Sequence, residues 1–482
     1  MIPPRRHGDR GASFLEYGAV ILLVSAIVVG VFGLGIPARV AALFETGLER
    51  IGAPGSDGTA APDEGGDEPE YWGQAAPDQN GGGSDSDSDS DYDPAPPPGH
   101  PAGSPAPESR GADPDNADPD AVEAAVEELD ECLSTWSADD EVPWFVSGCA
   151  WEVFQDLSHE EFGAVVRDMS EEDLYRLFES GPMPMEQEYF DWLESVRQTA
   201  QLDTLRKLNE SDAYFFTEPD FSEVNGDAAA GNSPSSLEYE ELDDYTLFGS
   251  GDEDPVQWEH IRQGDLGDCW VMATMGAMAV QNPGAIEDMI EENVNGTYTV
   301  TFPGHPDPIT VTPDLPVDAR GDPGFASSNE DPPVIWPAIL EKAYAQMKGG
   351  DYSRLEDWHA GSAMLTFGGD TADYAPDDWV PPWEDVTMDG LADKFESGES
   401  ITLSTPLNGD GYELVDNGGT GEDGEEVPDT LVSAHVYFVE DVDREAGTVT
   451  IRNPWGTEHP EIVLDIDEVN ENFQALHAAE LG

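Results

Sequence analysis

The chain has 482 residues, a length that allows roughly two or three domains. Its 19 basic and 103 acidic residues give a formal net charge of −84. Because this charge repels nucleic-acid phosphates, we exclude nucleic acid as a partner. A halophilic habitat and calcium dependence both fit the charge, and composition does not separate them. With 3 cysteines, the chain is not a scaffold built on disulfides.

The first segment, residues 1–51, carries five Arg against four Asp and Glu, and contains an apolar run from Tyr17 to Ile36. The run is about long enough to span a bilayer. Arg5, Arg6 and Arg10 precede it, which predicts that the N-terminus lies inside and the bulk of the chain outside. A cleaved secretory signal is the alternative, but the run is long for one and lacks a small-x-small cleavage site at its end.

The words RGASFLEYGAVILLV in this segment resemble the N-terminus of Flp-type pilins from tight-adherence systems. Those precursors are cut after a glycine and keep Glu and Tyr at the fifth and sixth mature positions. Cleavage after Gly11 would put Glu16 and Tyr17 there. The resemblance implies contact with pilin-processing and export machinery. It also implies a single-pass membrane protein with its catalytic part extracytoplasmic, or a protein exported to the cell surface.

Residues 52–118 are dominated by Gly, Pro, Ser and Asp and include the run SDSDSDSDYD. Such a stretch has nothing to bury and repels itself, so we predict a disordered acidic linker. A calcium-binding repeat is the alternative, but the glycine-turn pattern of such repeats is missing.

Residues 119–213 show helical apolar spacing and predict a small helical region that is either a pro-region or a docking module. Ser158 with Glu161 is the signature of a capping box, and Ser170 followed by Asp173 is a weaker version. Two cysteines also lie here. Cys132 and Cys149 are close enough in sequence to bridge, and the pattern leaves their pairing open.

Residues 214–482 combine short β-like runs with one long amphipathic helix at 336–347. We predict an α+β catalytic unit with a helix-rich front and a sheet-rich back. The helix and the β-like runs have the sequences WPAILEKAYAQM, TYTVTF, PITV, VYFVEDV and TVTIRN.

The stretch QGDLGDCWVMATMGAMAV, residues 263–280, turns abruptly from glycine-rich to apolar. Asp268 is a suitable N-cap, which places Cys269 in the first turn of a buried helix. The helix dipole and the free backbone N–H groups there favour a thiolate and a lowered thiol pKa. A cysteine in such a run is also a common small core residue, so the nucleophile hypothesis needs a base.

His435 is the candidate base, because it opens the strand-like run HVYFVEDV. A hairpin centred on Arg444 places His435 across from Asn453, whose amide would hold the imidazole in the required tautomer. Gln263 lies before Cys269 across a glycine-rich turn, and its amide could join the Cys269 N–H in an oxyanion hole. Taken singly, each could be an ordinary strand, turn or loop residue.

The words QGDLGDCW, WPAILEKAYAQMKGG, SAHVYFVEDV and IRNPWG together resemble the protease core of the calpain family. The resemblance covers roughly residues 240–470 and implies a papain-like fold of two lobes with the site between them. It makes Cys269 the nucleophile, His435 the general base and acid, Asn453 the orienting residue and Gln263 the oxyanion donor. Trp455 corresponds to the tryptophan that shields the histidine–asparagine bond.

The resemblance implies proteolysis through an acyl-thioester, with proteins or peptides as substrates and no cofactor for the chemistry. Two alternatives remain: a non-catalytic pilin-like adhesion protein, and a papain-like acyltransferase of the transglutaminase type. The spacing from His435 to Asn453 is shorter than in animal calpains, and the loop at 408–429 is unusually acidic. No EF-hand pattern follows the core. Calcium stays open as an activator, and its ligands are unknown.

Overall fold

The structure is a computed structural model in which the chain divides into two units, Met1–Glu68 and Pro69–Gly482. All residues that it describes lie in the second unit. The predicted membrane helix, the pilin-like segment and most of the predicted linker lie outside the described residues. Within the described part, no helix has both the length and the apolar character needed to cross a membrane. The described residues are 110–134, 144–178, 187–211, 217–224, 237–242, 244–249, 255–356, 360–369, 386–406, 412–415, 429–432 and 434–482.

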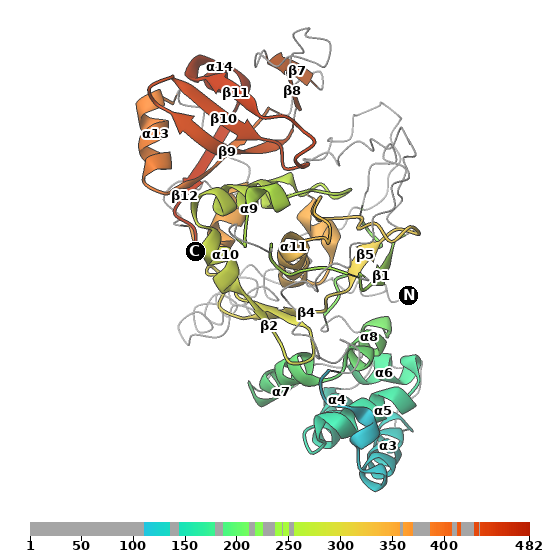
Figure 1. Cartoon of the computed structure of the whole chain (residues 1–482). Coiled ribbons are helices and arrows are strands. Elements are labelled where there is room, and N and C mark those ends of the chain that lie inside the picture. Colours follow the sequence, from blue (N-terminus) through green and yellow to red (C-terminus); the bar gives the residue numbers. More distant parts are fainter. Residues whose placement is uncertain are drawn as a thin grey trace, which may run out of the picture. The chain divides into compact units, whose positions relative to one another are not determined.

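A helical domain comes first along the described chain (Figure 1). Its helices bury their apolar faces in one shared core. The capping box at Ser158 and Glu161 is confirmed, because each side chain accepts the backbone N–H of the other residue. The elements are the 3-10 helix η2 (Pro114–Asn116), α3 (Pro119–Ser134), α4 (Trp144–Phe154), α5 (His159–Asp168), α6 (Glu171–Phe178), α7 (Gln187–Thr199) and α8 (Leu202–Glu210).

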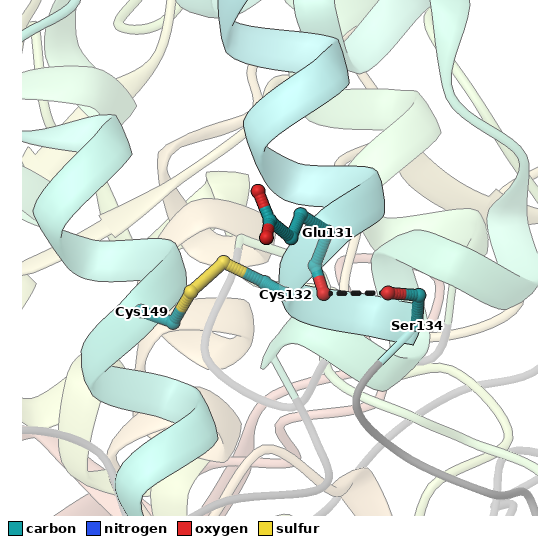
Figure 2. Close-up of a disulfide and its surroundings, with 4 residues drawn as sticks. All are labelled: Glu131, Cys132, Ser134 and Cys149. Carbon is teal, nitrogen blue, oxygen red and sulfur yellow. Dashed lines mark hydrogen bonds between the residues drawn. A yellow bond between two sulfur atoms is a disulfide. The ribbon is translucent and has the colours of Figure 1, made fainter.

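A disulfide joins the two helices α3 and α4 (Figure 2). Cys132 and Cys149 have Cα atoms 6.0 Å apart, within the usual range for a bridge. The structure thereby shows that these two cysteines are paired, a point that the sequence leaves open. Cys269 is left as the one free cysteine of the chain.

Residues 110–118, at the end of the predicted linker, pack onto the rest of the second unit. Asp113 caps η2 with its side chain. Ala112 donates its N–H to the Thr199 carbonyl at 2.7 Å, and Arg110 pairs with Glu292 at 2.8 Å. The regular packing of the chain therefore begins before α3.

The front part of the predicted catalytic region, residues 214–482, surrounds two buried helices, α9 and α11, with one hydrophobic core. The helix predicted at 336–347 is confirmed as α11. Strands β2, β3 and β4 form an antiparallel sheet beside it, and β1 pairs with β5. The elements are β1 (Glu238–Glu240), η4 (Trp258–His260), α9 (Cys269–Gln281), α10 (Pro283–Met289), β2 (Ile290–Glu292), β3 (Tyr298–Val300), β4 (Ile309–Val311), β5 (Leu315–Val317), α11 (Trp336–Met347), η5 (Tyr352–Leu355) and α12 (Ala360–Thr366).

The back part is a five-stranded antiparallel sheet of order β11-β10-β9-β6-β12, with a hydrophobic core of its own. Helices α13 and α14 contribute to that core, and β7 and β8 form a separate hairpin. The described region is thus a mixed helix and sheet structure, as predicted. The elements are α13 (Met388–Glu396), β6 (Ser400–Ser404), β7 (Tyr412–Val415), β8 (Asp429–Val432), β9 (Val436–Asp443), β10 (Thr448–Arg452), β11 (Ile462–Asp465), α14 (Ile466–Asn472) and β12 (Ala475–Ala479).

The hairpin of β9 and β10 is present, but its predicted register is wrong. Arg444 lies at the start of the turn and not at the centre of the pairing, since Asp443 pairs with Thr448. A register shift between Thr450 and Ile451 then changes the pairing further along. The irregularity at this point cannot be read from the alternation of side chains alone.

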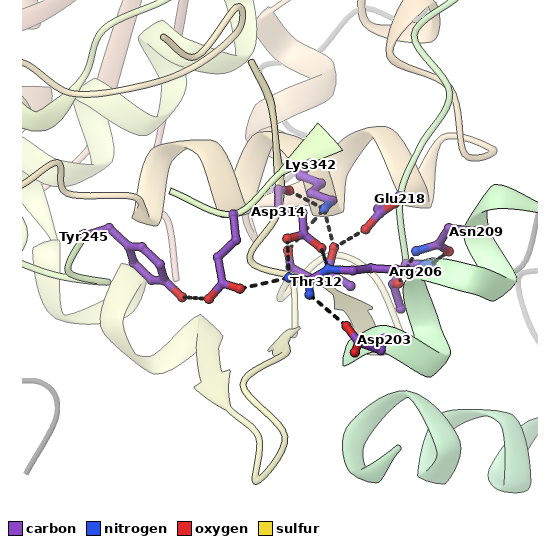
Figure 3. A network of polar contacts seen from close by, with 10 residues as sticks. Asp203, Arg206, Asn209, Glu218, Tyr245, Thr312, Asp314 and Lys342 are labelled. Atoms are coloured by element: carbon purple, nitrogen blue, oxygen red, sulfur yellow. Dashed lines mark hydrogen bonds and ion pairs between the residues drawn. The ribbon is translucent and has the colours of Figure 1, made fainter. Parts of the chain in front are cut away.

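The helical domain is joined to the catalytic region by a polar cluster around Arg206 of α8 (Figure 3). The Arg206 guanidinium donates to both carboxylate oxygens of Asp314, at 2.8 and 3.1 Å, and to Glu241 at 2.8 Å. Lys342 of α11 donates to the carbonyl of the same Asp314 at 2.6 Å. A bidentate arginine–carboxylate pair is among the stronger charged contacts. It therefore holds α8 against the segment at Asp314, which Lys342 of α11 also contacts.

Candidate active site

Two glycines set the position of α9. A Cβ atom on Gly264 would lie 2.3 Å from the Gly324 carbonyl oxygen, so the turn before the helix can pass there only as glycine. A Cβ on Gly276 would lie 2.7 Å from the ring of Phe438 in β9. Because the helix has no side chain at that point, it packs directly on the strand that follows His435.

His435 and Asn453 lie at the same end of the hairpin, one directly before β9 and the other directly after β10. The Nε2 atom of His435 is 2.9 Å from the Oδ1 atom of Asn453. That Oδ1 also accepts the backbone N–H of Trp455 at 3.1 Å. Since the oxygen can only accept, the hydrogen of the neutral imidazole lies on Nε2. Nδ1 therefore presents its lone pair, and it is buried without a hydrogen-bond partner.

The ring of His435 is held between two aromatic side chains. The ring of Trp455 lies at a centroid distance of 4.8 Å, and the ring of Tyr437 meets it edge-on at 5.1 Å. Ala434, just before the histidine, has a φ of 53°, a left-handed conformation that costs an L-residue roughly 1–2 kcal/mol. Its N–H donates to the Pro406 carbonyl at 3.0 Å, which helps to hold this conformation.

Short backbone contacts bring the other two predicted residues to the same place. The backbone N–H of Val436, the residue after His435, lies in hydrogen-bond contact with the Cys269 sulfur and favours its thiolate. The backbone N–H of Gln263 donates to the Pro454 carbonyl at 2.8 Å, next to Asn453. The structure thus gathers all four predicted site residues, and Trp455 covers the histidine.

The side-chain amide of Gln263 uses only part of its hydrogen-bonding capacity. Its Nε2 donates to the Leu266 carbonyl at 2.6 Å, within the turn that leads to the cysteine. One amide hydrogen is thereby used and the second has no acceptor assigned. Its Oε1 is buried without a partner. The group is held in place and retains one N–H donor for a further acceptor.

The predicted lowering of the Cys269 pKa is wrong for this structure. Burial raises the pKa of the thiol to about 12, and the charge of Asp268 adds to the rise. Backbone N–H groups of Val436, Trp270 and Cys269 act in the opposite direction but do not outweigh burial. The prediction failed because it counted the helix N-terminus and could not count the loss of water around the sulfur.

The histidine shows the complementary shift. Burial lowers the pKa of His435 to about 4, although its bond to Asn453 favours the charged form. A thiol of raised pKa and an imidazole of lowered pKa both stay neutral between pH 4 and 12. The site is therefore described in a resting form, with the proton on sulfur and the free lone pair on Nδ1.

The site is closed to solvent in this form. The exposed fractions are 2 % for Cys269, 0 % for His435, 1 % for Gln263 and 8 % for Asn453. A cavity of about 820 Å³ lies elsewhere, beside Arg206, Glu218 and Tyr239. Access of a substrate to the sulfur therefore requires the surroundings of the site to open.

A metal centre does not fit the described residues. Within the described ranges, no three or more His, Cys, Asp or Glu side chains are grouped so that they could hold a metal ion. Most of the acidic loop at 408–429 lies outside those ranges. We therefore assign no calcium ligand and no chemical step to a metal.

Three features of the site were missed from the sequence. Asp268 occupies the N-cap position of α9, but its side chain makes no capping hydrogen bond. It is buried and faces Glu341 of α11. The contact from Val436 to the cysteine sulfur was also missed. The sequence holds no signal for the acid pair, because the burial of Glu341 appears only once α11 is packed.

Residues 244–461 match the family model described as calpain family cysteine protease. Curated relatives include the calpain-type cysteine protease ADL1 of Oryza sativa subsp. japonica, 29 % identical over 210 residues, and DEK1 of Zea mays, 28 % identical over 212 residues. Each alignment covers 42 % of this chain and 9 % of the plant protein. Calpain-9 of Homo sapiens is 26 % identical over 208 residues, covering 41 % of this chain and 28 % of that protein. The chain thus spans less than a third of the length of these relatives.

Proposed function

We infer from the calpain-family cysteine protease domain at residues 244–461 that this protein is a cysteine endopeptidase that hydrolyses peptide bonds in protein substrates. One observation carries the proposal. The Nε2 of His435 is tied to Asn453 while its Nδ1 is free, and the next residue in the chain contacts the Cys269 sulfur. This is the arrangement that a thiol nucleophile and its base require.

In the first half of the reaction, Nδ1 of His435 takes the proton of the Cys269 thiol. The thiolate attacks the peptide carbonyl carbon, and the carbonyl oxygen becomes an oxyanion. The backbone N–H of Cys269 and the free amide hydrogen of Gln263 stabilise that oxyanion. The imidazolium then gives its proton to the leaving nitrogen, the C–N bond breaks and an acyl-thioester remains.

In the second half, His435 removes a proton from water, and the resulting hydroxide attacks the thioester carbonyl. The C–S bond breaks, the acid is released and the proton returns to sulfur. Asn453 holds the imidazole so that Nδ1 faces the sulfur in both steps. Trp455 keeps water from the histidine–asparagine bond, which preserves the strength of that bond.

The two hydrophobic cores of the catalytic region support a papain-like division into two lobes. The cysteine belongs to the core around α9, and the histidine and asparagine belong to the hairpin of the sheet. We propose that the helical domain is a docking module, because Arg206 fixes it to Asp314 and Glu241. The helical domain also contacts the β2–β3–β4 sheet through α7, where Gln198 donates to Thr299 of β3 and Glu194 accepts from Thr310 of β4.

Export of the catalytic domain is a further part of this proposal, and it rests on the pilin-like N-terminal words. The disulfide between Cys132 and Cys149 supports it, since such bonds persist in oxidising compartments. Substitution of Gly11 should leave the precursor uncut, as judged by the N-terminus of the mature protein. Normal cleavage of that variant would contradict the hypothesis of a pilin-like N-terminus.

The hydrolase proposal is tested with an unfolded protein substrate, in the presence and absence of an added primary amine and of calcium. We expect new C-terminal carboxylates and no transfer to the amine, because Asn453 and Gln263 favour hydrolysis. Amide-linked amine in the products would identify an acyltransferase. No product at all with intact Cys269, with and without calcium, would favour the non-catalytic adhesion alternative.

Substitution of Gln263 by alanine should lower kcat by about 10²–10³, the usual loss for one oxyanion donor. KM should change little, because the donor acts on the transition state. The backbone contact of this residue with Pro454 does not depend on the side chain, so the fold should persist. The control is alkylation of Cys269 by iodoacetamide, which forms no oxyanion and should keep its rate. Equal losses in both reactions would place the glutamine in a structural role.

A further inference from the structure

Two buried carboxyl groups, one of them on the residue directly before the cysteine, are not used by the proposed chemistry. Asp268 is 0 % exposed and Glu341 is 1 % exposed. They belong to different elements, the N-cap of α9 and the middle of α11. The carboxyl group of Asp268 is in hydrogen-bond contact with that of Glu341. Both carboxyl oxygens of Asp268 are buried, and neither accepts a hydrogen bond from a backbone or side-chain N–H or from a hydroxyl group.

Two carboxylates cannot share a contact of this kind while both are charged. At least one proton must therefore stay between them, and it makes one carboxyl a donor to the other. Burial raises the pKa of Asp268 to about 7 and that of Glu341 well above its usual range. Lys342, the next residue of α11, donates instead to three oxygens of Thr312 and Asp314.

The carboxyl pair is connected to the 263–269 turn at two places, through Asp268 in the chain and through the segment that Glu341 contacts. Asp268 is bonded directly to Cys269. Glu341 accepts the backbone N–H of Ala326 at 3.1 and 3.2 Å. Two residues earlier, the carbonyl of Gly324 accepts the N–H of Asp265, in the turn that follows Gln263. The carboxyl pair therefore links α11 to the helix end with the nucleophile and to the segment that supports the oxyanion turn.

The titratable groups that face the pair show which neighbouring pKa values depend on its charge. An ionised Asp268 raises the pKa of the Cys269 thiol. Glu356, after η5, adds a negative charge that opposes ionisation of Asp268. Tyr352 of η5 also senses both carboxyls, and it stays neutral because its own pKa is raised. The Cys269 thiol is thus a neighbour whose reactivity at neutral pH depends on the proton of the pair.

We propose that Asp268 and Glu341 form a proton-sharing carboxyl pair that positions the 263–269 turn and whose charge on Asp268 sets the reactivity of the Cys269 thiol. The inference deepens the proposed protease function, since it concerns the nucleophile of that reaction. Both are positioning residues that act through the cysteine. At low pH the pair is fully protonated and neutral, and the thiol ionises more easily. As Asp268 loses its proton near neutrality, the added negative charge makes the thiol harder to ionise.

The test measures the rate of Cys269 alkylation by iodoacetamide from pH 5.5 to 9 on the full chain, without any peptide substrate. Below and above pH 7, the logarithm of the rate should rise by one for each pH unit, as the thiolate fraction does. Near pH 7 the rise should flatten, so that the line at high pH lies roughly tenfold below the extension of the line at low pH. We call this offset the step, and it is the effect of one nearby like charge. The disulfide leaves Cys269 as the one free thiol, so labelling reports on this site alone.

Two isosteric variants separate the roles. Asp268→Asn cannot ionise but can still donate to Glu341, so its profile should lose the step and exceed the wild-type rate roughly tenfold above pH 8. Glu341→Gln keeps a permanent donor beside Asp268, so the step should remain but move to lower pH. Glu218→Gln, which removes a buried carboxyl on the Lys342 side of α11, is the matched control and should leave the profile unchanged.

The inference is overturned if Asp268→Asn keeps the wild-type step, or if both variants shift the whole profile equally. If either variant fails to fold, the infrared carbonyl band of a protonated carboxylic acid supplies a second measurement. That band should be present in the wild-type protein at pH 7 and smaller in the variant that folds; its absence from the wild type would also overturn the inference. Because no cleavage is measured, a step without peptidase activity would refute the proposed function and leave this inference intact.

Discussion

Replacing Cys269 with alanine should abolish peptide cleavage, with a loss of turnover on the order of 10⁴–10⁶. A triad acts as a unit, so removal of its nucleophile loses almost all of the chemical acceleration. The substitution deletes one buried sulfur and should cost about 1 kcal/mol of stability. Cleavage rate and the midpoint of thermal unfolding are measured on the same preparation.

The comparison variant is Cys269→Ser, which restores the size of the side chain but offers a weaker nucleophile. It should fold like the wild type and remain nearly inactive. Cleavage at more than about a tenth of the wild-type rate in the alanine variant would show that another group performs the attack. A variant that is inactive because it is unfolded would reveal itself in the thermal scan.

Replacing His435 with alanine should lower turnover by a comparable factor, on the order of 10⁴–10⁶. The thiol of Cys269 then has no base, and its own pKa of about 12 leaves almost no thiolate at neutral pH. The bond to Asn453 is lost as well. Steady-state cleavage measures the effect, and iodoacetamide labelling at high pH shows that the cysteine is still present and reactive.

A matched control is available at His459, whose ring lies 5.4 Å from that of Trp455 and which has no part in the proposed proton transfer. His459→Gln should change turnover only a few-fold. Equal losses at His435 and His459 would mean that aromatic packing, and not proton transfer, explains the effect at His435.

Much of the catalytic region could be read from the sequence because its elements carry strong patterns. The amphipathic spacing of 336–347 gives α11 residue for residue, and the alternating runs give β9 and β10. The turn at QGDLGD gives the start of α9 at Cys269. These predictions depend on spacing within a short segment, which is the information that a single sequence holds.

What depends on contact between distant segments could not be predicted. The register of the β9–β10 hairpin is altered by an irregularity after Thr450, and hydrophobic alternation does not reveal it. The close packing of Gly276 on Phe438 joins residues far apart in the chain. The raised pKa of Cys269 follows from burial by the same packing. Local chemistry at the helix N-terminus suggested the opposite shift.

The carboxyl pair illustrates the same limit. Asp268 was predicted as an ordinary N-cap, because aspartate at the start of a helix usually accepts a backbone N–H. Only the packing of α9 against α11 turns it away from the helix and towards Glu341. In a chain with 103 acidic residues, no spacing rule distinguishes these two.

The most direct test of the account combines cleavage with chemical trapping. The protein is treated with increasing amounts of a peptidyl epoxide, and the fraction of Cys269 that is modified is measured by mass spectrometry beside the remaining cleavage rate. The account predicts that activity falls in proportion to modification of Cys269 and reaches zero when the cysteine is fully modified. Cleavage that continues with Cys269 fully modified would contradict it.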